Sequence, residues 1–237
     1  MRAMTAVIGL ALGLAMHTPL ADTPAPSPFT ATYEVTYRGM RAGSLKFVFA
    51  RGEDGRYTFE TRAEPSLLAR LLVSPAAVER STMQIGPQGV RPLEWRLDDG
   101  RSGSRDGRLE FEWERGVAQG VIEGQRVELQ IEPGVQDRSS IQIAVSAALL
   151  RGQEPGTVPM IDEDRIKHYT YARKEQVVLD TPFGRLDTIL YESTRPGSSR
   201  VSRLWLAPQL DYAPARVEQI RKGKVETVMV LREWRSG

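Results

Sequence analysis

Alternation of apolar and polar residues is the feature that most limits what this chain can fold into. From Thr30 onward, short runs repeat the pattern of half-buried β-strands, as in ATYEVTYRG (31–39) and KVETVMVLREW (224–234). Turns rich in Gly and Asp, such as GEDG (52–55), separate the runs at intervals of roughly ten residues. PSLLARLLVSP (65–75) interrupts them and predicts a short surface helix. The pattern predicts an all-β protein, mainly an antiparallel meander of roughly fourteen strands.

One central segment, Gly134–Gly152, breaks the alternation and predicts a buried helix. Its apolar residues cover nearly the whole circumference of a helix near 139–150. Asp137, Ser139 or Ser140 can accept hydrogen bonds from the N–H groups of the first turn, and the final glycine ends the helix. A helix that is apolar on nearly all sides belongs in the interior. The sequence therefore predicts a curved, partly open barrel or β-spiral around one buried helix.

The N-terminal residues have the composition of an export signal followed by a spacer. Arg2 precedes an apolar stretch of signal-peptide length, Ala6–Met16, which is too short to span a bilayer. We expect a signal peptide over 1–21, a proline-rich spacer over 22–29 and a single β domain over 30–235. No later segment is long and apolar enough for a transmembrane helix. The sequence predicts a soluble periplasmic protein without a transmembrane anchor.

The composition excludes several classes of chemistry. The chain has no Cys, so thiol nucleophiles, zinc–thiolate sites and iron–sulfur clusters are excluded. Without the predicted signal peptide it keeps one His, His168, so it cannot form a His-rich metal site, and no G-x-S-x-G motif supports a catalytic triad. The net charge is +2, and no Lys- or Arg-rich block favours nucleic-acid binding. We expect no cofactor and no nucleic-acid partner.

Two groups of adjacent acidic residues lie in predicted turns. Asp98 and Asp99 belong to LDDG, and Asp162, Glu163 and Asp164 belong to IDEDR. Glycoside hydrolysis needs two carboxylates that face each other at a set separation, which neighbouring turn residues rarely provide. Neither group has the spacing of an EF-hand loop. We expect both to be solvated turns and predict no metal site.

Charged residues in the second half of the chain are predicted to form a structural polar cluster. Its members are Asp137, Arg138, Asp187 and Asp211. Asp187 lies on an apolar-leaning strand face in TPFGRLDTILYE (181–192), where an unpaired buried carboxylate is costly, and Arg138 is its expected partner. Asp211 is well placed for an Asx-type turn between two strands.

Four aromatic residues are candidates for lining a ligand pocket. They are Trp205, Tyr212, Tyr169 and Tyr171. Large aromatic side chains in strands also serve as plain core or interface residues, and that alternative stays open at each position. His168 alternates with the two tyrosines of IKHYTYAR, so we expect it to face solvent.

Several segments resemble a known family. GVQDRSSIQIA (134–144), TPFGRLDTILYE (181–192), RLWLAPQLDYAPARVEQI (203–220), YEVTYRGMRAGSLKF (33–47) and AVERSTMQIGPQGVRPLEW (77–95) are similar to segments of the domain-of-unknown-function 3108 family. The resemblance covers almost the whole chain after the predicted signal peptide. It implies an exported, mainly β protein of bacterial envelopes and brings no catalytic residues. The family's recurring positions correspond here to Asp137, Arg138, Asp187, Trp205, Asp211 and Tyr212.

Three functions follow from these features. A long sheet curved around a helix offers a concave apolar surface suited to a lipid or an extended peptide. The first hypothesis is a non-catalytic binding or scaffold protein for a cell-envelope component, either a lipid, a glycan fragment or a peptide. The second is an envelope enzyme that acts on glycans through Asp137, Asp187 or Asp211. The third is an interaction module that offers a sheet edge to a protein partner in the envelope.

Overall fold

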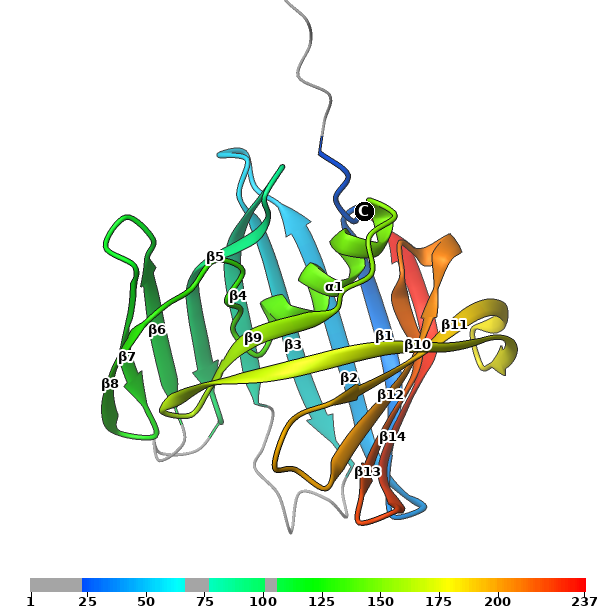
Figure 1. Cartoon of the computed structure of the whole chain (residues 1–237). Coiled ribbons are helices and arrows are strands. Elements are labelled where there is room, and N and C mark those ends of the chain that lie inside the picture. The colour runs from blue at the N-terminus through cyan, green and yellow to red at the C-terminus, as the bar shows by residue number, and fades with distance from the viewer. Residues whose placement is uncertain (1–22, 67–76, 101–105) are drawn as a thin grey trace, which may run out of the picture.

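The computed structural model describes residues 23–66, 77–100 and 106–237, which form one antiparallel sheet and one α-helix (Figure 1). The helix α1 (Ser140–Leu150) lies between β8 and β9, and a short 3-10 helix η2 (Pro208–Leu210) lies between β12 and β13. The strands are β1 (Phe29–Tyr37), β2 (Met40–Arg51), β3 (Tyr57–Pro65), β4 (Val78–Gly86), β5 (Gly89–Asp98), β6 (Gly107–Glu112), β7 (Val117–Ile122), β8 (Gln125–Gln130), β9 (Thr157–Asp162), β10 (Arg165–Thr181), β11 (Gly184–Thr194), β12 (Arg200–Ala207), β13 (Ala213–Arg221) and β14 (Lys224–Ser236).

The sheet consists of two meanders joined side by side. One runs from β1 to β8 and the other from β9 to β14, and β1 pairs antiparallel with both β2 and β14. The strands β8 and β9 are therefore the two ends of a fourteen-stranded sheet that does not close. The predicted all-β class, the meander and the partly open barrel are confirmed.

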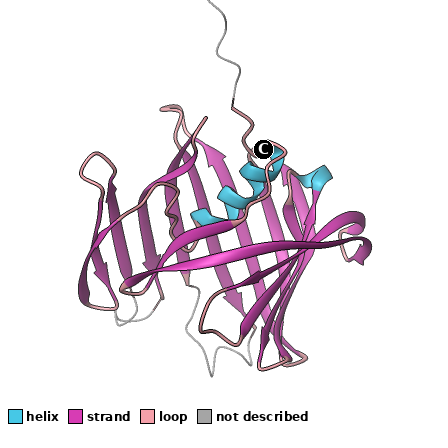
Figure 2. Ribbon diagram, viewed as in Figure 1, coloured by secondary structure: helices cyan, strands magenta, loops and turns pink. Residues whose placement is uncertain are grey.

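The helix α1 lies inside the curve of the sheet (Figure 2). Ile143 and Ala147 belong to a core cluster built mainly from β1–β5 and β13–β14. Val145 and Leu149 belong to a second cluster with β11 and β12. Because strands meet the helix on different sides, an almost wholly apolar helix is stable here. The predicted buried helix is confirmed.

Local hydrogen bonds fix both ends of α1. The Asp137 Oδ1 accepts the backbone N–H groups of Ser139 (2.8 Å) and Ser140 (2.7 Å). Ser139 is the N-cap residue but makes no side-chain capping bond. At the other end, Gly152 has a φ of 69°, which glycine adopts without strain, and its N–H donates to the Leu149 carbonyl (2.9 Å). The start of the helix is therefore held by a carboxylate placed before it.

One backbone bridge and shared core contacts hold the two ends of the sheet near each other. Gln136, which follows β8, donates its N–H to the Pro159 carbonyl and accepts the N–H of Ile161, both at 2.9 Å. These bonds form an isolated parallel bridge between Gln136 and Met160 of β9. Ile161 also packs in a core cluster with Val127 of β8. Backbone hydrogen bonds and side-chain packing thus connect β9 with the segment that follows β8, although β8 and β9 do not pair as strands.

Some predictions from the sequence fall outside the described residues. The predicted signal peptide (1–21) does so entirely, and residues 67–75 of the predicted surface helix do so as well. The spacer over 22–29 and the domain over 30–235 stay predictions. The first strand begins at Phe29 and the last ends at Ser236. In the described part of the chain, no helix has the length and apolar character needed to cross a membrane.

Candidate functional site

A groove of about 230 Å³ lies between α1 and the concave face of β9–β14. Residues of the helix and of strands far apart in the sequence line it together. Half of the lining residues are apolar, among them Ile141, Val145, Met160, Leu204, Leu206 and Val217, and two tyrosines add their rings to the walls. A concave, mainly apolar hollow with a small number of polar groups is the usual form of a small-molecule site. This groove is the candidate binding site of the protein.

Strand alternation explains which residues face the groove. In β12, Ser202, Leu204 and Leu206 line it. Trp205 lies between two of these residues, so its side chain points to the outer face of the sheet. There the guanidinium of Arg216 stands 5.6 Å from the centre of the indole ring. Trp205, predicted as a ligand residue, is therefore not part of the groove.

Tyr169 and Tyr171, two further predicted ligand residues, do line the groove, from β10. Burial raises the pKa of Tyr171 to about 12, although a hydrogen bond with Ser193 lowers it. Burial also raises the pKa of Tyr169, whose hydroxyl donates to Asp162 Oδ2 (3.4 Å). Both phenols stay neutral at physiological pH and add polar groups to an apolar wall. His168, which lies between them in sequence, is exposed.

Tyr212 lies beside the groove. It follows Asp211 in the turn after η2, where both residues have a left-handed backbone with φ values of 59° and 51°. The Tyr212 side chain packs against the buried cluster that contains Val145 and Leu206. Its carbonyl accepts a hydrogen bond from Ser146 Oγ (3.3 Å). Tyr212 thus fixes the turn against the helix and is not among the residues that line the groove.

The structure does not bring the residues of the predicted polar cluster together. Asp137 is buried at the start of α1, and Asp187 is exposed on β11. The Asp211 Oδ2 accepts the N–H of Ser27, near the beginning of the described chain (2.8 Å). An exposed carboxylate such as Asp187 needs no buried partner. In the described structure, no hydrogen bond or ion pair joins two side chains of this predicted cluster.

Arg138, the expected partner of Asp187, lies elsewhere, at the edge of the groove. Its guanidinium stands 4.8 Å from the centre of the Trp95 ring, and its Nε is 3.7 Å from Glu79 Oε1. The same oxygen of Glu79 accepts the indole N–H of Trp95 (2.6 Å). Arg138 also lines the groove. It therefore connects β4 and β5 with the site between α1 and the other half of the sheet.

Asp137 is a buried carboxylate with an unusual environment. Its side chain is 1% exposed and accepts hydrogen bonds from Ser81 Oγ (2.6 Å) and from the N–H groups of Ser139 and Ser140. Burial raises its pKa to about 6; the hydrogen bonds lower it, and the negative charge of Glu79 raises it further. The residue joins the start of α1 to β4. It does not line the groove.

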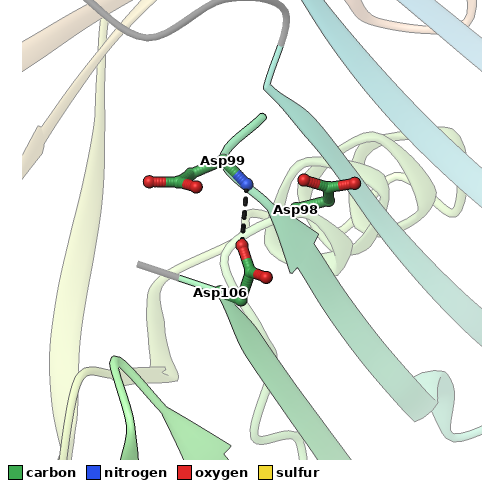
Figure 3. A group of neighbouring side chains, drawn as sticks. All are labelled: Asp98, Asp99 and Asp106. Carbon is green, nitrogen blue, oxygen red and sulfur yellow. Dashed lines mark hydrogen bonds between the residues drawn. The ribbon is translucent and has the colours of Figure 1, made fainter. Parts of the chain in front are cut away.

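Three carboxylates gather where β5 ends and β6 begins (Figure 3). Oxygens of Asp98, Asp99 and Asp106 lie within 4.8 Å of one another. The Asp106 Oδ1 accepts the N–H of Asp99 (3.1 Å), and the Asp98 Oδ1 accepts that of Gly100 (2.8 Å). The expectation of a solvated turn is wrong for Asp99, which is 4% exposed and donates its N–H to Asp106. Nothing else in the described structure points to a cation here.

The outer face of β3–β7 carries a larger hollow of about 580 Å³. Its charged residues have both signs and include Glu60, Arg62, Arg80, Arg96, Arg108 and Asp106. Glu60 accepts hydrogen bonds from both Arg62 and Arg80. A solvated face on which opposite charges pair with one another contributes little binding energy. The smaller groove is the better candidate because half of its lining residues are apolar and only one of its described lining residues is charged.

Sequence reasoning missed most of the groove. It identified neither the three serines Ser146, Ser193 and Ser202 nor the methionines Met160 and Met229, all of which line it. Alternation within each strand does show which residues share a face. It does not show which strands lie opposite the helix, because that depends on how the whole sheet curves.

Comparison with a solved structure confirms the fold class. The chain resembles a beta-barrel-like protein of domain of unknown function DUF1849 from Brucella abortus, with a TM-score of 0.55, 13% identity, and coverage of 90% of this chain and 99% of that chain. A "putative lipoprotein" from Parabacteroides distasonis has a TM-score of 0.40 and 10% identity, with coverage of 90% of this chain and 97% of that chain. At these identities the likeness shows the fold alone.

The family assignment rests on the sequence. No curated protein matches this chain. A family model described as "Protein of unknown function (DUF3108)" matches residues 32–230, which includes every strand from β2 to β13 and the helix α1. Since this match spans far more than half of the 237 residues, the chain belongs to the DUF3108 family of proteins of unknown function.

Proposed function

We propose that this protein is a non-catalytic binding protein of the cell envelope that holds the apolar chain of a lipid. The observation that carries the proposal is the groove between α1 and β9–β14, whose walls are mainly apolar. An apolar wall favours a lipid over a glycan fragment, because a glycan needs many hydrogen-bonding partners to replace its water. The polar groups along the groove suit the more polar end of such a ligand.

The volume of the groove limits the size of the ligand. A water-sized group occupies about 30 Å³, so a groove of 230 Å³ holds roughly eight such groups. This space fits one acyl chain of moderate length. It does not fit several chains side by side. The proposed ligand is therefore a single-chain lipid, or one chain of a larger lipid.

The location in the envelope belongs to the proposal as well. Arg2 and the apolar stretch Ala6–Met16 have the pattern of a cleaved export signal. A binding protein exported in this way meets envelope lipids in the periplasm.

The other two hypotheses have less support. Of the carboxylates considered for glycan hydrolysis, Asp137 is bonded to Ser81, Asp211 accepts the N–H of Ser27, and Asp187 is exposed on β11. The end strand β8 has only six residues and carries Arg126 and Glu128, and short charged edges are the kind that resist pairing with another chain.

Mass spectrometry of organic extracts tests the proposal. The protein is purified from the periplasm without detergent, as the wild type and as two variants of β12. Ser202→Trp fills the groove, because Ser202 lines it. Val201→Trp is the matched control, because its side chain points to the outer face of the same strand. Thermal unfolding first establishes that both variants fold.

We expect the wild type and Val201→Trp to carry a single-chain lipid in stoichiometric amount, and Ser202→Trp to have lost it. The proposal is wrong if the wild type carries no lipid, or if folded Ser202→Trp retains as much as the control.

A further inference from the structure

We infer that the ligand of this groove is an anionic amphiphile and that Arg138 binds its oxyanion head, a carboxylate or a phosphate. The inference rests on the proposed lipid-binding function and names the class of lipid. Its basis is charge: of all the described residues that line the groove, Arg138 alone is charged. A ligand that places its chain along Val145 and Leu204 meets this one cation at the edge of the groove.

The guanidinium of Arg138 is available for a ligand. Its side chain is 32% exposed, and the nearest carboxylate oxygen, Glu79 Oε1, is 3.7 Å from Nε, which is longer than a hydrogen bond. Within the described residues, no hydrogen bond from this guanidinium is formed. A guanidinium presents a fork of N–H donors that matches the oxygens of a carboxylate or a phosphate.

The surroundings of Arg138 hold it in place without using those donors. Trp95 is buried, and its indole N–H donates to Glu79, which fixes the ring. The guanidinium lies over that ring, an arrangement favoured by the negative charge of the ring face. A positioned cation with free donors loses less conformational entropy on binding an anion than a mobile surface side chain does.

Apart from Glu79, whose Oε1 is 3.7 Å from the Arg138 Nε, the neighbouring acids are engaged elsewhere. Asp137 accepts three hydrogen bonds from its own turn and from Ser81, and it does not line the groove. Asp162, which Tyr169 contacts, is 2.7 Å from the ammonium group of Lys167. Inside the groove, therefore, the guanidinium of Arg138 is the group that distinguishes anionic from cationic ligands.

Calorimetric titration of the mature protein tests this assignment. The probes share one chain length, are used below the concentration at which they form micelles, and differ in charge: decanoate, decyl phosphate and decylamine. We expect both anions to bind roughly ten- to a hundredfold more tightly than decylamine, the effect of a hydrogen bond to a charged group. Preference for decyl phosphate over decanoate, or the reverse, identifies the head group.

Variants show which residue causes the preference for anions. Arg138→Gln should weaken both anions by the same factor and leave decylamine unchanged. Because this change can disturb the contact with Trp95, a second pair alters the charge without touching Arg138. Gln142, on the first turn of α1, lines the groove as well. Gln142→Lys should strengthen the binding of decyl phosphate, and Gln142→Glu should weaken it.

The outcomes separate the two proposals. If decylamine binds as tightly as the anions and neither Arg138→Gln nor the Gln142 pair changes this, the groove binds lipids but the anionic class is wrong. If inorganic phosphate competes fully with decyl phosphate at equal concentration, the site recognises an ion and the amphiphile is wrong. If none of the three probes binds the wild-type protein, the lipid-binding function fails, and the ligand class fails with it.

Discussion

The change Asp137→Asn should make the protein more stable at neutral pH. Asp137 is almost fully buried, and its hydrogen bonds with Ser81, Ser139 and Ser140 only partly offset the loss of water around its charge. Asparagine can keep all three contacts: its carbonyl accepts the two backbone N–H groups, and its amide donates to the Ser81 hydroxyl. The variant therefore removes the charge and retains the geometry at the start of α1.

The size of the effect follows from the pKa of Asp137. Burial raises it from 3.8 to about 6, so between these pH values the folded protein binds a proton that the unfolded chain has released. The contribution of Asp137 to stability is therefore full below pH 3.8, falls as the pH rises through the folded pKa, and is lost above it. A difference of about two pH units corresponds to about 3 kcal/mol. Asparagine carries no charge and does not lose this stability.

Urea unfolding, followed by tryptophan fluorescence between pH 3.5 and 8, measures the effect, over a pH range set by the cited pKa. The useful quantity is the free energy of unfolding of Asp137→Asn minus that of the wild type. Salt-bridged carboxylates such as Glu60 and Glu192, whose pKa values are lowered by hydrogen bonds from arginine, contribute equally to both proteins and cancel. The difference should be near zero below pH 4 and should rise to as much as about 3 kcal/mol above pH 7.

Ser81→Ala gives an independent check. It removes the hydroxyl that lowers the pKa of Asp137. The free energy of unfolding of Ser81→Ala should therefore keep falling to a higher pH than that of the wild type. The account of this buried carboxylate would be refuted if the free energy of unfolding of Asp137→Asn minus that of the wild type were independent of pH, or fell as the pH rises.

Three further predictions concern packing and the faces of the sheet. A Cβ at Gly107 would lie 2.5 Å from the Trp95 ring, so Gly107→Ala should lower the free energy of unfolding by roughly 1–3 kcal/mol. Gly86→Ala, in open space, should change it by less than about 0.5 kcal/mol, and equal effects in urea unfolding would contradict the packing described. The Tyr33 hydroxyl is buried without a hydrogen-bond partner among the described residues, so Tyr33→Phe should retain or increase thermal stability, and a marked loss would reveal a partner. Trp205→Ala, on the outer face, should leave the affinity for decyl phosphate unchanged in calorimetry, and a tenfold loss would place Trp205 in the site.

Local patterns in the sequence were enough to predict the architecture. Alternation indicates each strand without knowledge of its partner, because a strand buries one face whatever it pairs with. The segment that becomes α1 is apolar on almost every side, so its burial could be predicted in the same way. The helix begins at Ser140 and ends at Leu150, close to the predicted 139–150, because Asp137 accepts the N–H groups at its start and Gly152 turns the chain just after its end.

The site could not be predicted in this way because it depends on contacts between distant segments. Asp137 is bonded to Ser81, 56 residues earlier. Arg138 lies over Trp95, not beside Asp187, and no local pattern marks a stacked pair of this kind. Periodicity shows which residues share a face, whereas the curvature of the sheet decides which faces meet across the barrel.

The sequence did contain the information needed to place Trp205 on the outer face of the sheet. In RLWLAP it alternates with Leu204 and Leu206, and the structure places these two leucines in the groove. Once one face of β12 is known to be the inner one, the position of Trp205 on the outer face follows. The size of an aromatic side chain says less about its role than the face on which it lies.

The position of a bound ligand is the central claim, and the methionine methyl groups report it most directly. Met160 and Met229 line the groove, Met83 is buried but does not line it, and Met40 is exposed. We would label these methyl groups with carbon-13 and record NMR spectra during a titration with decyl phosphate. The account predicts saturable shifts at Met160 and Met229, with Met83 and Met40 unchanged. Shifts confined to Met40, or no shift at Met160 and Met229 at saturating ligand, would contradict it.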